Sequence, residues 1–181
     1  MYRPAPVRKR VLHRGLVAPQ SHLSDVRASL EAYGANAAAS MAWPLANLAL
    51  GYPFQVNETV TVYSMWLATG GTAGGNFDLG IYDLAGNRLV STGTTARTVN
   101  AHTDVTALTD TVLTPGHYYA MMAADGVENY AGWTMVAAGN NEAQGYVEAT
   151  SSFVLPNPIT LARTTRTQIP YFGLNFYSAA S

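Results

Sequence analysis

The sequence contains no cysteine, few charged residues and no long apolar run. Without cysteine the chain has no disulfides, thiolate metal sites or thiol nucleophiles, which is compatible with folding in a reducing cytosol. Charged residues make up 12% of the chain and hydrophobic residues 48%, which indicates a globular protein with an uncharged surface. No apolar run reaches the length of a membrane span, and Arg8-Lys9-Arg10 has no apolar signal core behind it. We therefore expect neither a secretion signal nor a membrane partner.

The net charge of −1 hides an uneven distribution. Residues 1–35 carry six basic and two acidic side chains, whereas residues 36–181 carry four basic and nine acidic ones. A basic arm can bind nucleic acid, an acidic membrane surface or an acidic protein patch, or it can be a solvated tail. We expect a protein partner, because the case for nucleic acid rests on charge alone. The basic residues assigned to this assembly arm are Arg3, Arg8, Lys9, Arg10 and Arg14.

One short helix is predicted inside the arm, over residues 21–33. Ser24 is a candidate N-cap and Gly34 a C-terminal stop. A helix of about three turns is marginal in isolation, so its apolar face must pack against another surface. That face comprises Leu23, Val26, Leu30 and Tyr33. We place the domain boundary after residue 35, which gives a basic arm (1–35) and a β-sandwich domain (36–181).

The body is organised around a predicted hairpin. Phe77, Leu79 and Ile81 alternate with polar or small residues, which is the period of a strand with one buried face. Residues 85–87 have turn chemistry, and residues 88–92 form the return strand. We therefore expect the three alternating apolar side chains to point into the core.

Further strands give the fold class. We predict them at residues 41–50, 59–68, 117–123, 133–138, 145–149 and 168–177, with a weak strand and a long connection in the threonine-rich span 94–114. Pro44 confines the first of these to a sheet edge or a bulge. Simple alternation in 59–68 places Val62 and Trp66 on one face and Met65 on the other, and both faces are apolar enough to be covered. About eight strands without a β-α-β pattern predict an all-β fold, an antiparallel β-sandwich or jelly roll.

The motif order GIYD, AGN, LVSTG and LTPGHYYAMMAADG resembles the β-sandwich modules of tailed-bacteriophage virion proteins, the fibre, tail and capsid-decoration components. The resemblance covers about residues 55–177 and leaves out the basic arm. It implies a non-enzymatic structural or recognition role in a virion assembled in the host cytoplasm. The partners it implies are copies of the chain and other virion proteins. Similar motifs occur in carbohydrate-binding and adhesion sandwiches, so a module that binds a host-surface glycan is the alternative.

The sequence shows no constellation suited to catalysis or metal binding. The histidines lack the spacing of metal ligands, and the serines lack a nucleophile motif. Asp78 and Asp83 lie five residues apart on a strand, so they point to opposite faces and cannot act as a paired acid and base. Loop carboxylates are present without a calcium-loop motif: Asp104, Asp110, Asp125 and Glu128. We expect no enzyme, no metal and no cofactor.

Aromatic residues are the candidates for ligand contact. Tyr130 and Trp133 border the loop at residues 125–129, where they can stack on a sugar or fill the core. For Trp66, on a strand that is apolar on both faces, we expect the core. Two hypotheses follow: a virion structural protein that assembles through its arm, and a glycan-binding module that uses Tyr130 and Trp133.

Overall fold

The computed structural model describes residues 13–16, 39–71, 74–134, 138–150 and 152–178. In these residues the chain is an all-β protein built from antiparallel sheets, as the sequence predicts. Fifteen strands are described rather than about eight, together with one helix of six residues, α2 (Ala138–Ala143). The predicted arm helix lies outside the described residues.

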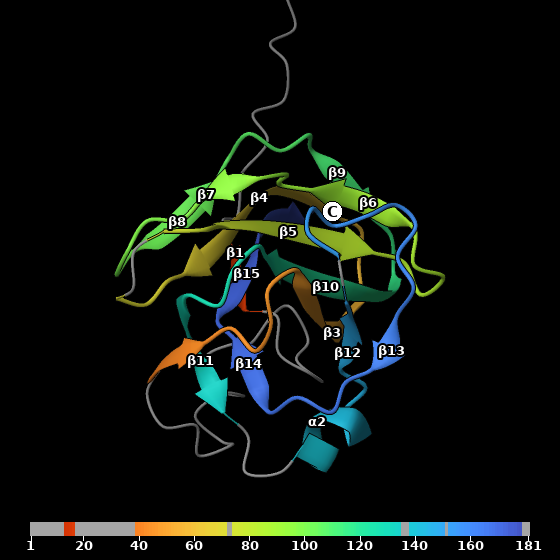
Figure 1. Cartoon of the computed structure of the whole chain (residues 1–181). Helices are drawn as coiled ribbons and strands as arrows, with labels where there is room; N and C mark the ends of the chain where they lie inside the picture. The colour runs from red at the N-terminus through yellow and green to blue at the C-terminus, as the bar shows by residue number, and fades with distance from the viewer. Residues whose placement is uncertain (1–12, 17–38, 72–73, 135–137, 151, 179–181) are drawn as a thin grey trace, which may run out of the picture.

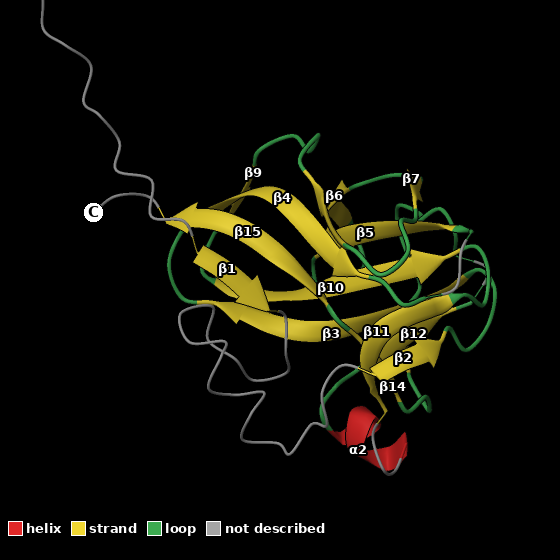
Figure 2. Cartoon of the chain, turned by 90° about the vertical axis from the view of Figure 1, so that its left-hand side faces the viewer, coloured by secondary structure: helices red, strands yellow, loops and turns green. Residues whose placement is uncertain are grey.

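Sheet A has the strand order β1-β15-β4-β8, with β9 also paired to β4. Its strands are β1 (His13–Leu16), β4 (Val60–Ala68), β8 (His102–Val105), β9 (Thr111–Leu113) and β15 (Phe172–Ser178). Figure 2 shows β1 beside β15 at the edge of this sheet. Residues 13–16 of the predicted arm thus form a strand of sheet A.

Sheet B has the order β13-β12-β3-β10-β5-β6, with β7 also paired to β5. Its strands are β3 (Leu48–Val56), β5 (Asn76–Tyr82), β6 (Arg88–Ser91), β7 (Thr95–Ala96), β10 (Gly116–Ala124), β12 (Val147–Ala149) and β13 (Ala162–Arg163). The predicted hairpin is confirmed as β5 and β6. In its turn, Asp83 Oδ1 accepts hydrogen bonds from the backbone N–H groups of Ala85 and Asn87, and hydrogen bonds from Asn87 lower the pKa of Asp83.

Sheet C is small, with the order β14-β11-β2. Its strands are β2 (Ala39–Ala42), β11 (Asn129–Thr134) and β14 (Gln168–Pro170). The single strand predicted at residues 41–50 is wrong: the chain forms β2, turns, and starts β3 at Leu48. Pro44 has no N–H to donate to a sheet ladder, and Asn47 adopts a φ of 58°, in the left-handed region, so the two strands do not run on as one.

The main core lies between sheets A and B. Phe77, Leu79 and Ile81 are fully buried there, which confirms the predicted hairpin register. Other large contributors from sheet B include Leu48, Leu50, Tyr52, Phe54, Val56, Tyr118 and Met122, and those from sheet A include Val60, Val62, Met65, Leu67, Leu113, Phe172, Leu174 and Phe176. Along β15 the core side chains are the alternate residues Phe172, Leu174 and Phe176, as the sequence predicts, although Gly173 and Asn175 between them are also buried.

A register shift in β4 overturns the predicted face assignment of that strand. Asn175 pairs with Ser64, whereas the next residue, Phe176, pairs with Val62, so Tyr63 is the extra residue of a β-bulge. The bulge reverses the alternation: Val62 before it and Met65 after it both point into the core. Simple alternation had separated these two side chains onto opposite faces.

A segment without regular structure, residues 152–161, covers the outer face of sheet B, and we call it the strap. In Figure 1 it is the blue loop that passes β6 before it reaches β13. Leu155 and Ile159 of the strap form a second buried cluster with the sheet residues Ala49, Tyr82, Met121, Ala123, Val147 and Ala149. The central strands of sheet B, β3, β5 and β10, are therefore buried on both faces, although alternation along β5 had predicted only one buried face.

Candidate functional site

The outer face of sheet A, on the side away from the core, carries a cluster of aromatic side chains. Phe172, Leu174 and Phe176 point into the core, so the alternate positions of β15 face outward. We call this cluster the aromatic face; its members are Tyr63, Trp66, Tyr171 and Tyr177. None of its tyrosines was predicted as a site residue, although the alternation along residues 168–177 places Tyr177 opposite the core.

Ring geometry divides the aromatic face into two pairs. Tyr63 and Tyr177 are stacked, with ring centroids 5.6 Å apart and planes 20° from parallel. Trp66 and Tyr171 meet edge to face at 5.0 Å and 75°. Trp66 is only 4% exposed, so it is buried as expected, but against Tyr171 rather than between the two sheets. The three tyrosines remain partly exposed, which leaves ring surface for a ligand.

Polar groups adjoin these rings. The amide Nδ2 of Asn175 donates to Ser64 Oγ at 2.8 Å and to Asp104 Oδ1 at 3.1 Å. The hydroxyl of Tyr177 donates to Asp110 Oδ2 at 2.7 Å. Asp104 and Asp110 are themselves exposed. The rings can stack on a flat apolar surface of a ligand, while the neighbouring carboxylate and amide oxygens can accept hydrogen bonds from hydroxyl groups at the edge of that surface.

The structure contradicts the prediction that Tyr130 contacts a ligand. Tyr130 is completely buried and packs edge to face on Trp43, with ring centroids 5.5 Å apart. The guanidinium carbon of Arg97 lies 5.1 Å from the centroid of the Tyr130 ring. Burial raises the pKa of Tyr130 well above its usual value. The backbone of Trp133 pairs with Ile169 in sheet C, and its side chain is outside what the structure describes.

Arg97 and Asp125 fasten the loops around Tyr130. Arg97 is 8% exposed and donates to the carbonyl oxygens of Gly70 at 2.9 Å, Gly74 at 3.3 Å and Asn129. Asp125 accepts from the backbone N–H of Asn76 at 2.7 Å and from its amide at 2.6 Å. These charged side chains satisfy backbone and amide groups, so they act as structural supports for the loops.

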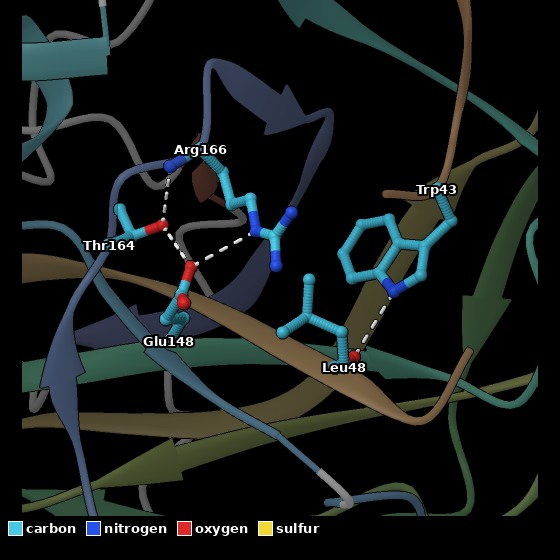
Figure 3. A network of polar contacts seen from close by, with 5 residues as sticks. All are labelled: Trp43, Leu48, Glu148, Thr164 and Arg166. Atoms are coloured by element: carbon cyan, nitrogen blue, oxygen red, sulfur yellow. Dashed lines mark hydrogen bonds and ion pairs between the residues drawn. The ribbon is translucent and has the colours of Figure 1, made fainter. Parts of the chain in front are cut away.

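A second polar network joins β12 to the segment before β14. Figure 3 shows Glu148 Oε2 accepting a hydrogen bond from the Thr164 hydroxyl at 2.6 Å and lying 3.4 Å from Nε of Arg166. The same figure shows the indole Nε1 of Trp43 donating to the carbonyl oxygen of Leu48 at 3.1 Å. Thr164 is 2% exposed. A substrate has little access to this hydroxyl, so its contact with Glu148 holds two segments together.

The remaining predicted residues are separated. Asp78 is buried under the strap and Asp83 lies in the hairpin turn, so the two carboxylates do not form a pair. Among the described residues, no three His, Asp or Glu side chains form a group that could hold a metal ion. Arg14 belongs to β1. The other arm residues lie outside the described ranges: Arg3, Arg8, Lys9, Arg10, Leu23, Val26, Leu30 and Tyr33.

No helix in the described ranges is both long and apolar enough to cross a membrane. Comparisons of this chain with protein-family models, with curated proteins and with solved structures found no match.

Proposed function

We propose that this chain is a non-enzymatic structural protein of a tailed-bacteriophage virion, a capsid-decoration, tail or fibre component that assembles through its N-terminal arm. The observation that carries the assembly role is the pairing of β1, from the arm, with β15 of the body. Addition of a strand to a sheet edge is a common way for one chain to join another, because backbone hydrogen bonds supply the affinity. The virion setting comes from the sequence resemblance.

The use of the polar groups supports a structural role. Each of four carboxylates is engaged within the domain: Asp78 by the strap, Asp83 by its turn, Asp125 by Asn76 and Glu148 by Thr164. Catalytic carboxylates are instead placed where they can reach a substrate. The low charge content of the chain also suits a surface that neighbouring subunits cover.

The test is the native mass of the full chain and of a chain that lacks residues 1–35. We expect the full chain to join an assembly and the truncated chain to fold, with one cooperative unfolding transition, but to stay out of the assembly. Leu30→Asp should cause much of the same loss, because it places a charge on the predicted apolar face of the arm helix. Undiminished incorporation of the truncated chain would overturn the proposal.

Glycan binding is the second candidate, and the aromatic face favours it. Tyr63 and Tyr177 present partly exposed rings beside Asp110, the combination that binds sugar rings by stacking and hydrogen bonding. A screen against immobilised glycans tests it. Tyr177→Ala should abolish binding, whereas Tyr130→Phe, a change inside the core, should leave it intact. Equal loss in both variants, or no binding by the parent chain, would exclude the aromatic face as a glycan site.

A further inference from the structure

We infer that β1 is exchanged between copies of this chain, so that the N-terminal strand of one copy pairs with β15 of a second copy. This inference deepens the proposed assembly role, on which it rests, by naming the partner as an identical subunit. It does not depend on the virion setting.

The geometry of the pairing allows either copy to supply β1. Four residues pair antiparallel with β15, from His13 opposite Phe176 to Leu16 opposite Gly173. Such pairing is made by backbone groups, which are identical in every copy. In the sheet order, β15 lies between β1 and β4, so without β1 it would be an edge strand. Unprotected edges recruit strands from other chains.

The connection to the rest of the chain is long. Residues 17–38 separate β1 from β2, and the two strands belong to different sheets. Figure 2 shows them in separate parts of the molecule. Closing a connection of 22 residues within one copy costs more entropy than closing a tight hairpin. For β1, pairing with β15 of the same chain is therefore only slightly more favourable than pairing with β15 of a neighbouring chain held nearby in an assembly.

Charge favours docking of the arm on another subunit. Residues 1–14 carry five basic and no acidic side chains, whereas residues 15–181 carry five basic and eleven acidic ones. Acidic bodies repel one another, and a basic arm donated between them offsets that repulsion. The register also places Arg14 opposite Asn175, whose amide donates to the exposed carboxylate of Asp104. The acceptor strand thus lies beside negative charge.

The absence of native cysteine permits a clean cross-linking test. Arg14→Cys and Asn175→Cys are introduced into separate full-length chains, which are then mixed and oxidised. Because the two positions face each other in the register, strand exchange predicts a disulfide-linked heterodimer as the main product on a non-reducing gel. In the double variant, exchange predicts bands at twice the monomer mass or above. Thr61→Cys/Tyr177→Cys, an opposed pair within β4 and β15, is the control and should cross-link within one chain.

Two results would overturn the exchange. One is a double variant that cross-links only within single chains while the mixed single variants stay monomeric. The other is no cross-link at all while the control pair oxidises. If the native mass still shows an assembly that removal of residues 1–35 abolishes, the assembly role stands and only the exchange fails. A full chain that is monomeric at every concentration and in the presence of its assembly partners refutes both.

Discussion

The carboxylate of Asp78 in β5 accepts a hydrogen bond from the backbone N–H of Leu155 in the strap, with Oδ2 and N 3.0 Å apart. The hydroxyl of Thr92 donates to the other oxygen at 3.1 Å. Asp78 is fully buried, and this burial raises its pKa, although the hydrogen bonds from Leu155 and Thr92 and the charge of Arg88 act in the opposite direction. An acid with these partners joins the strap to sheet B and makes the joint sensitive to pH.

The pH dependence of stability should carry the signature of Asp78. Because its pKa in the folded state lies above that in the unfolded state, the folded chain holds the proton more tightly. Its contribution to the free energy of unfolding is largest below the unfolded pKa, falls as pH rises toward the folded pKa, and is constant above it. Asp78→Asn should remove this decline. The free energy of unfolding of the variant should therefore rise relative to that of the parent chain between acid and neutral pH. Urea unfolding at a series of pH values checks this, and parallel curves would contradict it.

Tyr82→Phe tests a second fastening of the strap. The hydroxyl of Tyr82 donates to the carbonyl oxygen of Pro156 at 2.7 Å. Its loss should cost about 1 kcal/mol and increase hydrogen exchange of the amides near Pro156, with little change in sheet A. Tyr177→Phe, which removes the same atom from the aromatic face, is the matched control. If both variants exchanged like the parent near Pro156, this hydrogen bond would not hold the strap.

Alanine substitutions at two glycines distinguish the cost of backbone strain from the cost of a steric clash. Gly86 and Gly93 both have positive φ, 85° and 66°, so alanine is strained at either position, by about 1 kcal/mol. A Cβ at Gly93 meets nothing within 4 Å, whereas one at Gly86 would collide with the carbonyl oxygen of Ile159 in the strap. The N–H of Ile159 donates to the carbonyl oxygen of Gly86 at 2.9 Å. If the strap moved away to relieve the clash, this hydrogen bond would break. Gly86→Ala should therefore cost about 1–3 kcal/mol more than Gly93→Ala in equilibrium unfolding; equal costs would contradict this.

Ile81→Asp should be severely destabilising. Ile81 is completely buried between the two sheets, and an aspartate there has no partner for its charge, which should cost at least about 3 kcal/mol. Leu84→Asp in the adjoining turn is the control, because Leu84 is 60% exposed; its effect should stay within about 0.5 kcal/mol. Thermal unfolding compares the two, and an unchanged melting temperature for Ile81→Asp would mean that its side chain does not face the core.

Local sequence patterns predicted those features of the fold that depend on neighbouring residues. Alternation and turn residues placed the hairpin and the inward direction of Phe77 correctly. The same alternation assigned Asp78 to an uncovered face, because nothing within β5 reveals that the strap, whose Leu155 lies 77 residues later, covers it. Long-range contacts of this kind leave no period in the sequence.

The candidate site was harder to predict for two physical reasons. The bulge at Tyr63 changes the phase of β4, and a single inserted residue has no compositional signature. Tyr130 lies beside a polar loop, which suggested exposure, yet Arg97 and Trp43 enclose its ring. The arm could be recognised by its charge, but the pairing of β1 with β15 depends on backbone groups that every sequence shares.

The strap also determines when the outer face of sheet B is covered. Its hydrogen bonds to Asp78, Tyr82 and Arg88 span between 67 and 77 residues of chain. Contacts at such separations repay the entropy of loop closure only after the elements they join have formed. On a ribosome, a chain that ends before Leu155 leaves the outer face of sheet B open, and its apolar side chains are available to neighbouring nascent chains. Docking of the strap thus ends the exposure of this face during synthesis, whereas the core side of sheet A stays incomplete until β15 has been made.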